Sequence, residues 1–436
     1  MDIYDLESAF GARDVTSEAM RNAISEWFSA YYDGTVGTDN DPCQRVAYTV
    51  VGKLIKTIFG EYAPLADTAL GKQVVAALEP VKEEAVQLAL VGGECYLRPV
   101  FQNGKLCFLT VPRDRILIFA RDLQGVPTDV GCAARTQRGD GYYTLLERRT
   151  VDSRGYLTVK NQLFCSKRPD TLGNPVALSS LKEYEKLSAA YTYAKPVGSV
   201  GLIRLKTPML NCVDGSADGV SVYGAAMGLI RAVDENEAML RGEFQRGQSR
   251  ILVSRDLLDR DKKLTDHLFV GLDEDPDRVG ITVFAPDLRH QAFLDRKQEY
   301  LRNIESVVGL KRGMLSNISE SHRTATEIAA SAGDFNLTVM DFQRMWVTAM
   351  EDALALAAIL AQLYSLPDGD MGKISVDWGN GVLYDEDTQW ETYRIMVADG
   401  LLKPEIALAW RFNLPMQTAE DLKAVREKFM PEVIDG

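Results

Sequence analysis

The sequence has little histidine and no clustered cysteine. Only 3 histidines occur in 436 residues, and His267, His290 and His322 fall in three different predicted elements. The 6 cysteines are scattered, with no Cys-x-x-Cys pair. Zinc sites and triads built from neighbouring motif residues are therefore not expected. We interpret the cysteines as reduced thiols of an intracellular product that mostly fill the core, and we expect no metal and no catalytic residues.

Long hydrophobic runs are also missing. The longest apolar stretch, residues 353–363, is interrupted by Gln362 and follows Asp352. A membrane-spanning helix needs about 20 apolar residues, so no membrane partner is expected. Residues 1–5 contain neither the basic nor the apolar region of a secretory signal, and we expect none.

No phosphate-binding loop is present. Gly71-Lys72 and Gly104-Lys105 lack the upstream glycine and the following hydroxyl residue of such a loop, and no Gly-x-Gly-x-x-Gly segment follows a predicted strand. We therefore expect no nucleotide and no other cofactor. Two acidic clusters, residues 273–277 and 385–387, contain the residue types that hold Mg²⁺ for phosphoryl transfer. Solvated turns are the preferred interpretation of both.

The chain has fewer basic than acidic residues overall, but this imbalance is not uniform along it. The 49 Lys and Arg against 62 Asp and Glu give a net charge of −13. Residues 241–323 hold 15 basic and 14 acidic residues, whereas residues 366–436 hold 7 and 14. This balance argues against a tight, sequence-reading nucleic-acid binder, which usually has a basic domain.

The first part of the chain predicts helices followed by strands. Apolar residues recur at helical spacing over 24–31 and 46–58, and a third helical pattern over 72–90 is broken at Pro80. After Gly93 the pattern predicts hairpins over 96–111 and 142–160, which together with the helices form an α+β block.

A helix–strand–helix arm is predicted next. Helical stripes cover 221–248 and 287–309, the second beginning at a capping Asp287, and short strands are expected at 251–253 and 281–284 between them. Because two protruding striped helices cannot bury their apolar faces within one chain, we expect them to pack against copies of the chain or a partner.

A polar loop and a long helix complete the pattern. The loop, 310–323, leads into a helix predicted over 324–365, and Thr324 and Glu327 form a capping box at its start. Residues 366–436 are polar, acidic and mostly helical in pattern.

Several short stretches along the chain form an ordered set. They are a Trp…Tyr-x-Gly opening at 24–34, a helix-to-sheet transition at 88–99, Val308-Gly309-Leu310 followed by 324–328, and Val376-Asp377-Trp378 followed by 398–401. In this order they resemble the portal proteins of tailed double-stranded DNA bacteriophages, of the long-tailed, siphophage type.

The resemblance implies an α+β, mainly helical portal architecture, with antiparallel strands in its wing and clip. The implied regions are the wing (1–220), a first stem helix (221–248), the clip (249–286), a second stem helix (287–309), the tunnel loop (310–323), a long wing-to-crown helix (324–365) and a helical, acidic crown (366–436).

The resemblance also implies a function that is not enzymatic. About twelve copies would form a ring around a DNA channel at one capsid vertex, serving DNA packaging, retention and ejection. The implied partners are double-stranded DNA without sequence specificity, the terminase large subunit that hydrolyses ATP, the major capsid and scaffold proteins, and a head–tail adaptor. The protein would reside in the virion after assembly in the host bacterial cytoplasm.

The candidate site residues lie in the loop and the stem. In the loop we expect Lys311, Arg312 and Arg323 to face DNA, Asn317 and Ser319 to be neutral contacts, and His322 to accompany them. In the stem, Arg241 and Arg246 either face the channel or pair with a neighbouring subunit.

Two alternatives remain at this point. One is another virion component, such as a head–tail adaptor or a scaffold protein. The other is a Mg²⁺-dependent phosphoryl-transfer enzyme that uses Asp385, Glu386 and Asp387.

Overall fold

The computed structural model divides the chain into two compact units. The first comprises Met1–Ile58 with Pro64–Val376, and the second Phe59–Ala63 with Asp377–Gly436. About 49% of the chain is helix and 22% strand, which confirms the α+β class. The residues described are 3–32, 42–102, 105–247, 250–254, 269–272, 282–284, 288–317, 325–364, 371–379, 386–412, 414 and 419–429.

The predicted N-terminal helices are confirmed. They are α2 (Glu18–Tyr32), α3 (Val46–Ile58), α4 (Ala69–Leu78) and α5 (Lys82–Gly92), and a further helix, α1 (Ile3–Phe10), precedes them. The apolar stripe of α2 is buried at Ile24, Trp27 and Tyr31. Pro80 lies in a short 3-10 turn, η1 (Glu79–Val81), between α4 and α5, because proline cannot supply the amide that would continue the helix.

A three-stranded antiparallel sheet follows α5. Its order is β10-β2-β3, from β2 (Glu94–Gln102), β3 (Lys105–Pro112) and β10 (Ile203–Lys206). Leu97 pairs with Thr110, so the predicted 96–111 hairpin is confirmed.

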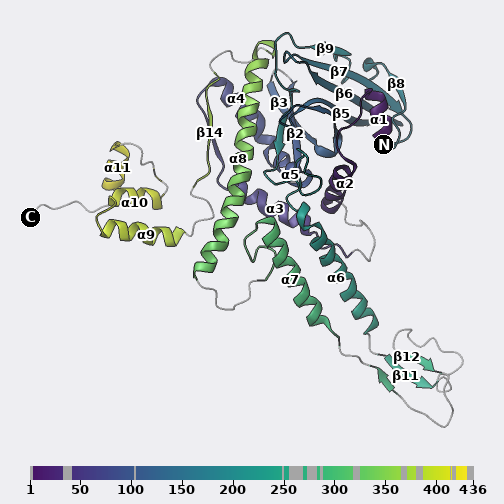
Figure 1. Cartoon of the computed structure of the whole chain (residues 1–436). Helices are drawn as coiled ribbons and strands as arrows, with labels where there is room; N and C mark the ends of the chain where they lie inside the picture. Colours follow the sequence, from purple (N-terminus) through teal and green to yellow (C-terminus); the bar gives the residue numbers. More distant parts are fainter. Residues whose placement is uncertain are drawn as a thin grey trace, which may run out of the picture. The chain divides into compact units, whose positions relative to one another are not determined.

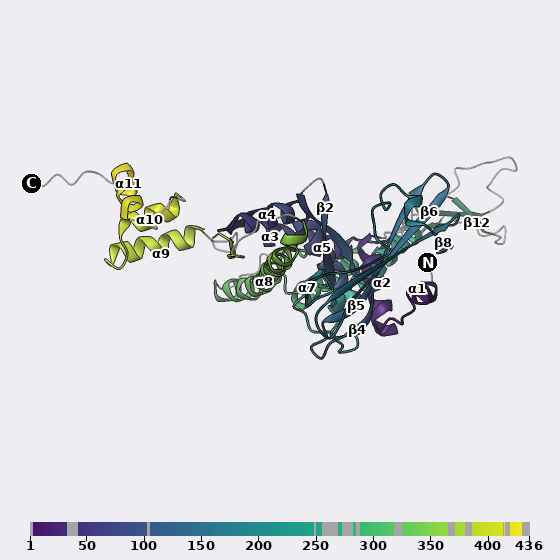
Figure 2. The same cartoon turned by 90° about the horizontal axis from the view of Figure 1, so that it is seen from above.

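The larger sheet holds six strands and includes the second predicted hairpin, β6 with β7. Phe10 of α1 packs with Phe119, Leu146 and Leu172 against this sheet, and Figure 2 shows α1 and α2 beside it. The strands are β4 (Ile116–Arg121), β5 (Pro127–Arg138), β6 (Gly141–Val151), β7 (Leu157–Ser166), β8 (Asn174–Val176) and β9 (Ala190–Thr192).

Two antiparallel helices, α6 (Met227–Arg246) and α7 (His290–Val308), form the arm and run side by side away from the sheets (Figure 1). Both begin later than predicted. Before α6, the chain makes a 3-10 turn, η4 (Gly224–Ala226). At α7 the residue before the helix is Arg289, which makes no capping bond. Asp287, the predicted cap, lies outside the described residues. Leu288 lies against Gly247 at the end of α6.

The described residues between α6 and α7 include three short strands. They are β11 (Arg250–Ser254), β12 (Phe269–Leu272) and β13 (Thr282–Phe284). β11 pairs with β13 antiparallel but with β12 parallel. The antiparallel pairing expected for the strands of this segment is confirmed for β11 with β13, and β12 adds a parallel pair. A parallel pair needs a crossover of about a dozen residues or more, and the long connection from Ser254 to Phe269 supplies that length.

The long helix α8 (Ala325–Tyr364) confirms the predicted helix and packs on α3, α4 and β10. Trp346 and Phe342 are fully buried in it. After α8, β14 (Ile374–Asp377) pairs with β1 (Ala63–Ala66). Among the described residues no helix combines the length and the apolar character needed to cross a membrane.

The second unit is helical, as predicted for the C-terminal region. It contains α9 (Glu386–Ala398), α10 (Pro404–Arg411) and α11 (Ala419–Phe429). Aromatic pairs hold the helices together: Tyr393 meets Trp410 edge-on at 4.8 Å, and Phe412 stacks on Phe429 at 4.6 Å.

Candidate functional site

Polar side chains join α6 to α7 along their length. Near the middle, the Asn236 amide donates to the Phe293 carbonyl at 3.0 Å. Lys297 Nζ lies 3.2 Å from Glu237 Oε2 and also donates to Gln44 at 2.7 Å. These contacts fix the register of the two helices on each other and on the segment before α3.

The two predicted stem cations both lie on α6. Arg241 Nε is 4.0 Å from Glu237 Oε1 one turn earlier. Arg246 is exposed, and its Nε donates to the Gly242 carbonyl at 3.2 Å. Each side chain thus has a partner on its own helix, and exposed pairs of this kind contribute about 1 kcal/mol or less to stability.

The start of the predicted loop is folded onto the end of α7. Lys311, Arg312 and Asn317 are exposed. The backbone amide of Asn317 donates to Gln298 Oε1 at 2.7 Å. The amides of Gly313, Leu315 and Ser316 all donate to Glu305.

The remaining loop predictions fall outside the described residues. Ser319, His322, Arg323 and Thr324 belong to this group, and the side chain of Glu327 is also not described. The helix α8 begins at Ala325, one residue after Thr324. The capping box and the DNA-facing role of these residues stay predictions.

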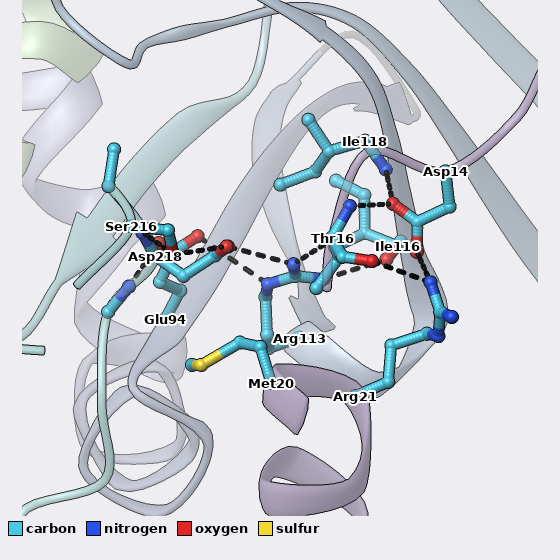
Figure 3. Close-up of polar contacts among 12 residues, drawn as sticks. Asp14, Thr16, Met20, Arg21, Glu94, Arg113, Ile116, Ile118, Ser216 and Asp218 are labelled. Atoms are coloured by element: carbon cyan, nitrogen blue, oxygen red, sulfur yellow. Dashed lines mark hydrogen bonds and ion pairs between the residues drawn. The ribbon is translucent and has the colours of Figure 1, made fainter. Parts of the chain in front are cut away.

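A buried group of charges joins the three-stranded sheet β10-β2-β3 to the turn between β3 and β4. We call Glu94, Arg113, Arg204 and Asp218 the Glu94 cluster. Figure 3 shows Arg113 between Asp218 and Thr16, and its Nη2 donates to each at 2.9 Å. Glu94 is fully buried and accepts from Tyr96 at 2.6 Å, from the Gly219 amide at 2.7 Å and from Arg204.

The electrostatics keep Glu94 ionised. Burial alone would raise the pKa of this carboxyl, but the charges of Arg204 and Arg113 outweigh burial and lower the pKa from 4.5 to about 2. A buried carboxylate is tolerated where paired cations and hydrogen bonds compensate its lost hydration. The Glu94 cluster therefore has a structural role, and each of its buried charges is stabilised by the others.

The Glu94 cluster positions the segment that leads into α6. Residues 207–223 connect β10 to η4, and we call them the strap. Asp218 of the strap binds Arg113 and Arg121, and the Val222 amide donates to the Leu90 carbonyl at 2.9 Å. The ion pairs of Asp218 and this backbone hydrogen bond thus connect the segment before the arm to the sheets and to α5.

The lowered pKa of Glu94 predicts acid sensitivity. A group whose pKa is lower in the folded chain contributes stability that is present above its unfolded pKa and is lost as pH falls towards its folded pKa. Between about pH 6 and about pH 3, we expect Glu94 to account for about 2 kcal/mol of the lost unfolding free energy. Urea unfolding of both proteins at the two pH values should show that the free energy of unfolding falls by about 2 kcal/mol less in Glu94→Gln than in the wild type. Equal falls in the two proteins would contradict the assignment.

The part of the chain that is described contains no candidate metal site. No group of three or more His, Cys, Asp or Glu side chains lies together there. Asp385 is outside that part, and the side chains of Glu386 and Asp387 are not described. His290 is exposed at the first residue of α7.

Sequence reasoning missed Glu305 and the Glu94 cluster. Glu305 had a signal: it is an acidic residue in the last turn of a helix, next to the buried stripe of Ile304 and Val308. An acid there is unfavourable for the helix dipole, so it needs a local reason. The Glu94 cluster had none, because its members are far apart in the chain and follow no periodic pattern.

Comparison with protein families matches residues 129–430 of the 436-residue chain to the family described as Phage portal protein, SPP1 Gp6-like. No match was found among curated proteins. The matched range contains β6, β7, the whole arm, α8 and most of the second unit. Since the match covers well over half of the chain, the protein belongs to the phage portal protein family of the SPP1 Gp6-like type.

Proposed function

We propose that this chain forms a ring of about twelve copies at one capsid vertex, and that double-stranded DNA passes through its channel during packaging, retention and ejection. The observation that supports this most is the family match over residues 129–430, which spans the arm and α8. The family indicates a virion capsid component that is structural rather than enzymatic. The proposed partners are the terminase large subunit, the major capsid and scaffold proteins and a head–tail adaptor, with assembly in the host cytoplasm.

The arm supports self-association. Four large apolar side chains on α6 and α7 are exposed by 43% to 57%: Met239, Phe244, Leu294 and Val307. Isolated exposed apolar residues are common, but here they are spread along a two-helix pair whose inner face is already used by packing of α6 on α7. A neighbouring copy, related by rotation, would cover them through a head-to-tail contact that closes into a ring.

The charge distribution supports passage of DNA rather than tight binding. The net charge is −13, and Lys311 and Arg312 are an exposed cationic pair at the end of α7. Each cation that neutralises a phosphate adds affinity by releasing counterions. A few cations on an acidic wall would guide DNA without holding it. In this proposal the wing, clip, tunnel loop and crown keep the boundaries given above, and the two stem helices are α6 and α7.

Charge reversal tests the proposed DNA contact. We expect Lys311→Glu with Arg312→Glu to leave ring formation intact and to lower the amount of packaged DNA about tenfold or more, because two cations per copy become anions. The measurement is DNA protected from nuclease in particles assembled with each variant.

A matched control exists in the same chain. Lys167 and Arg168 form the same exposed dipeptide after β7, far from α7 in sequence. Lys167→Glu with Arg168→Glu changes the net charge equally and should package DNA normally. Equal losses in both variants would show a general charge effect and would remove the proposed role of Lys311 and Arg312.

A further inference from the structure

Glu305 is a fully buried carboxylate in an unfavourable place. It is 0% exposed and lies four residues before Gly309, where α7 ends. The partial negative charge of a helix C-terminus repels an acid, and burial removes the hydration of the carboxylate. Something else in the fold must compensate both costs.

The compensation comes from the loop that follows α7. Glu305 Oε1 accepts from the amides of Gly313, Leu315 and Ser316 at 3.1, 2.6 and 2.8 Å. Glu305 Oε2 accepts from the Ser316 hydroxyl at 2.8 Å. Converging backbone amides of this kind form a concave anion-binding site, and here the anion is a side chain of the same chain.

The backbone of Glu305 holds the near end of the same loop. Its carbonyl accepts from the Gly309 amide and from the Leu310 amide, the latter at 2.8 Å. Gly309 has a φ of +78° there, which favours glycine and is typical of a helix C-cap. One residue therefore fixes the chain both before and after Lys311 and Arg312.

The geometry leaves the two cations at the outer turn of a fixed loop. The Met314 amide donates to the Lys311 carbonyl at 3.2 Å, which closes the turn that contains Arg312. Lys311 and Arg312 are exposed, whereas Ser316 is buried against Glu305. These hydrogen bonds anchor the described part of the loop, while its cationic side chains remain exposed.

We propose that Glu305 is a positioning residue for the DNA contact: it holds Lys311 and Arg312 at a set place at the end of α7, so that every copy presents its cations at the same level of the channel. This inference rests on the proposed function for the DNA contact itself. The clamp between Glu305 and residues 313–316 can be tested without DNA.

Limited proteolysis tests the clamp. Trypsin cleaves after Lys311 and Arg312 only when the surrounding segment opens, and the bonds to Glu305 oppose that opening. Glu305→Gln replaces one acceptor oxygen by an NH₂ group that faces amide donors. We expect cleavage at these two sites to be about tenfold faster, which corresponds to about 1.4 kcal/mol. Cleavage at an unchanged rate would overturn the clamp.

Two further variants keep the proteolysis test decisive. Glu299→Gln removes an exposed acid of the same helix, which pairs with Arg302 at 3.6 Å, and should cleave at the wild-type rate. Ser316→Ala removes one hydroxyl bond and keeps the carboxylate. If Glu305→Gln does not fold, Ser316→Ala should still show faster cleavage, by about threefold, and an unchanged rate there would overturn the clamp.

Salt dependence of DNA retention by purified assemblies tests positioning. The slope of log affinity against log salt reports how many phosphates are neutralised, which a purely structural role of Glu305 would not change. We expect Glu305→Gln to reduce the magnitude of this slope. When Lys311→Glu and Arg312→Glu are already present, Glu305→Gln should reduce it no further. An unchanged slope in Glu305→Gln would overturn the positioning role. If wild type itself shows no dependence on Lys311 and Arg312, the proposed DNA contact fails, while the proteolysis result for Glu305 stands.

Discussion

Arg113→Ala is expected to destabilise the first unit by about 3–5 kcal/mol, the usual cost of removing one partner from a buried charge group. Arg113 is 3% exposed and binds Asp218 and Thr16 at 2.9 Å. Its loss leaves Glu94 with Arg204 as its remaining cation in the Glu94 cluster. The measurement is the free energy of unfolding by urea.

An exposed pair in the same unit supplies the control for Arg113. Arg138 pairs with Glu183, and both side chains are about half exposed, at 54% and 48%. Arg138→Ala should cost less than about 1 kcal/mol, because solvent already screens this pair. If Arg113→Ala lowers the free energy of unfolding no more than Arg138→Ala does, the stabilising role of the Glu94 cluster is contradicted.

Gly93→Ala has the second large expected effect. Gly93 has a φ of +80°, and a Cβ there would lie 2.3 Å from the backbone of Gly219 in the strap. The substitution would force the strap away from the end of α5, breaking the 3.0 Å bond from the Thr207 amide to the Gly93 carbonyl. Left-handed strain and the backbone clash together should cost about 3–5 kcal/mol in urea unfolding.

Gly139→Ala is a control that separates left-handed backbone strain from the steric clash expected in Gly93→Ala. It has a φ of +60° in the β5–β6 turn, with nothing within 4 Å of the position of a Cβ. Gly139→Ala should therefore show only the left-handed strain, about 1–2 kcal/mol. If Gly93→Ala and Gly139→Ala cost the same, the close approach of the strap contributes nothing to stability.

Periodic and turn-based features could be predicted from the sequence. The helix over 324–365 and the 96–111 hairpin are close to α8 and to β2 with β3, because apolar spacing and turn residues determine such elements locally. The start of α6 was predicted too early, since Val222 and Tyr223 are apolar through burial in the strap and not through a helical face.

Features that depend on distant residues could not be predicted. The parallel pairing of β11 with β12 depends on a crossover that no local pattern marks. The candidate loop is predicted from its position and its charges. Lys311 and Arg312 are exposed there, and their contact with DNA stays a prediction. The anchoring of this loop by Glu305 depends on backbone amides, which every sequence has and no sequence motif identifies.

The mass and shape of the purified protein test the central claim most directly. Native mass measurement, together with negative-stain images, should show closed rings of about twelve copies around a central channel. The exposed apolar side chains of α6 and α7 would then be covered by neighbouring copies. A protein that remains a monomer at high concentration, without any ring in the images, would contradict the account.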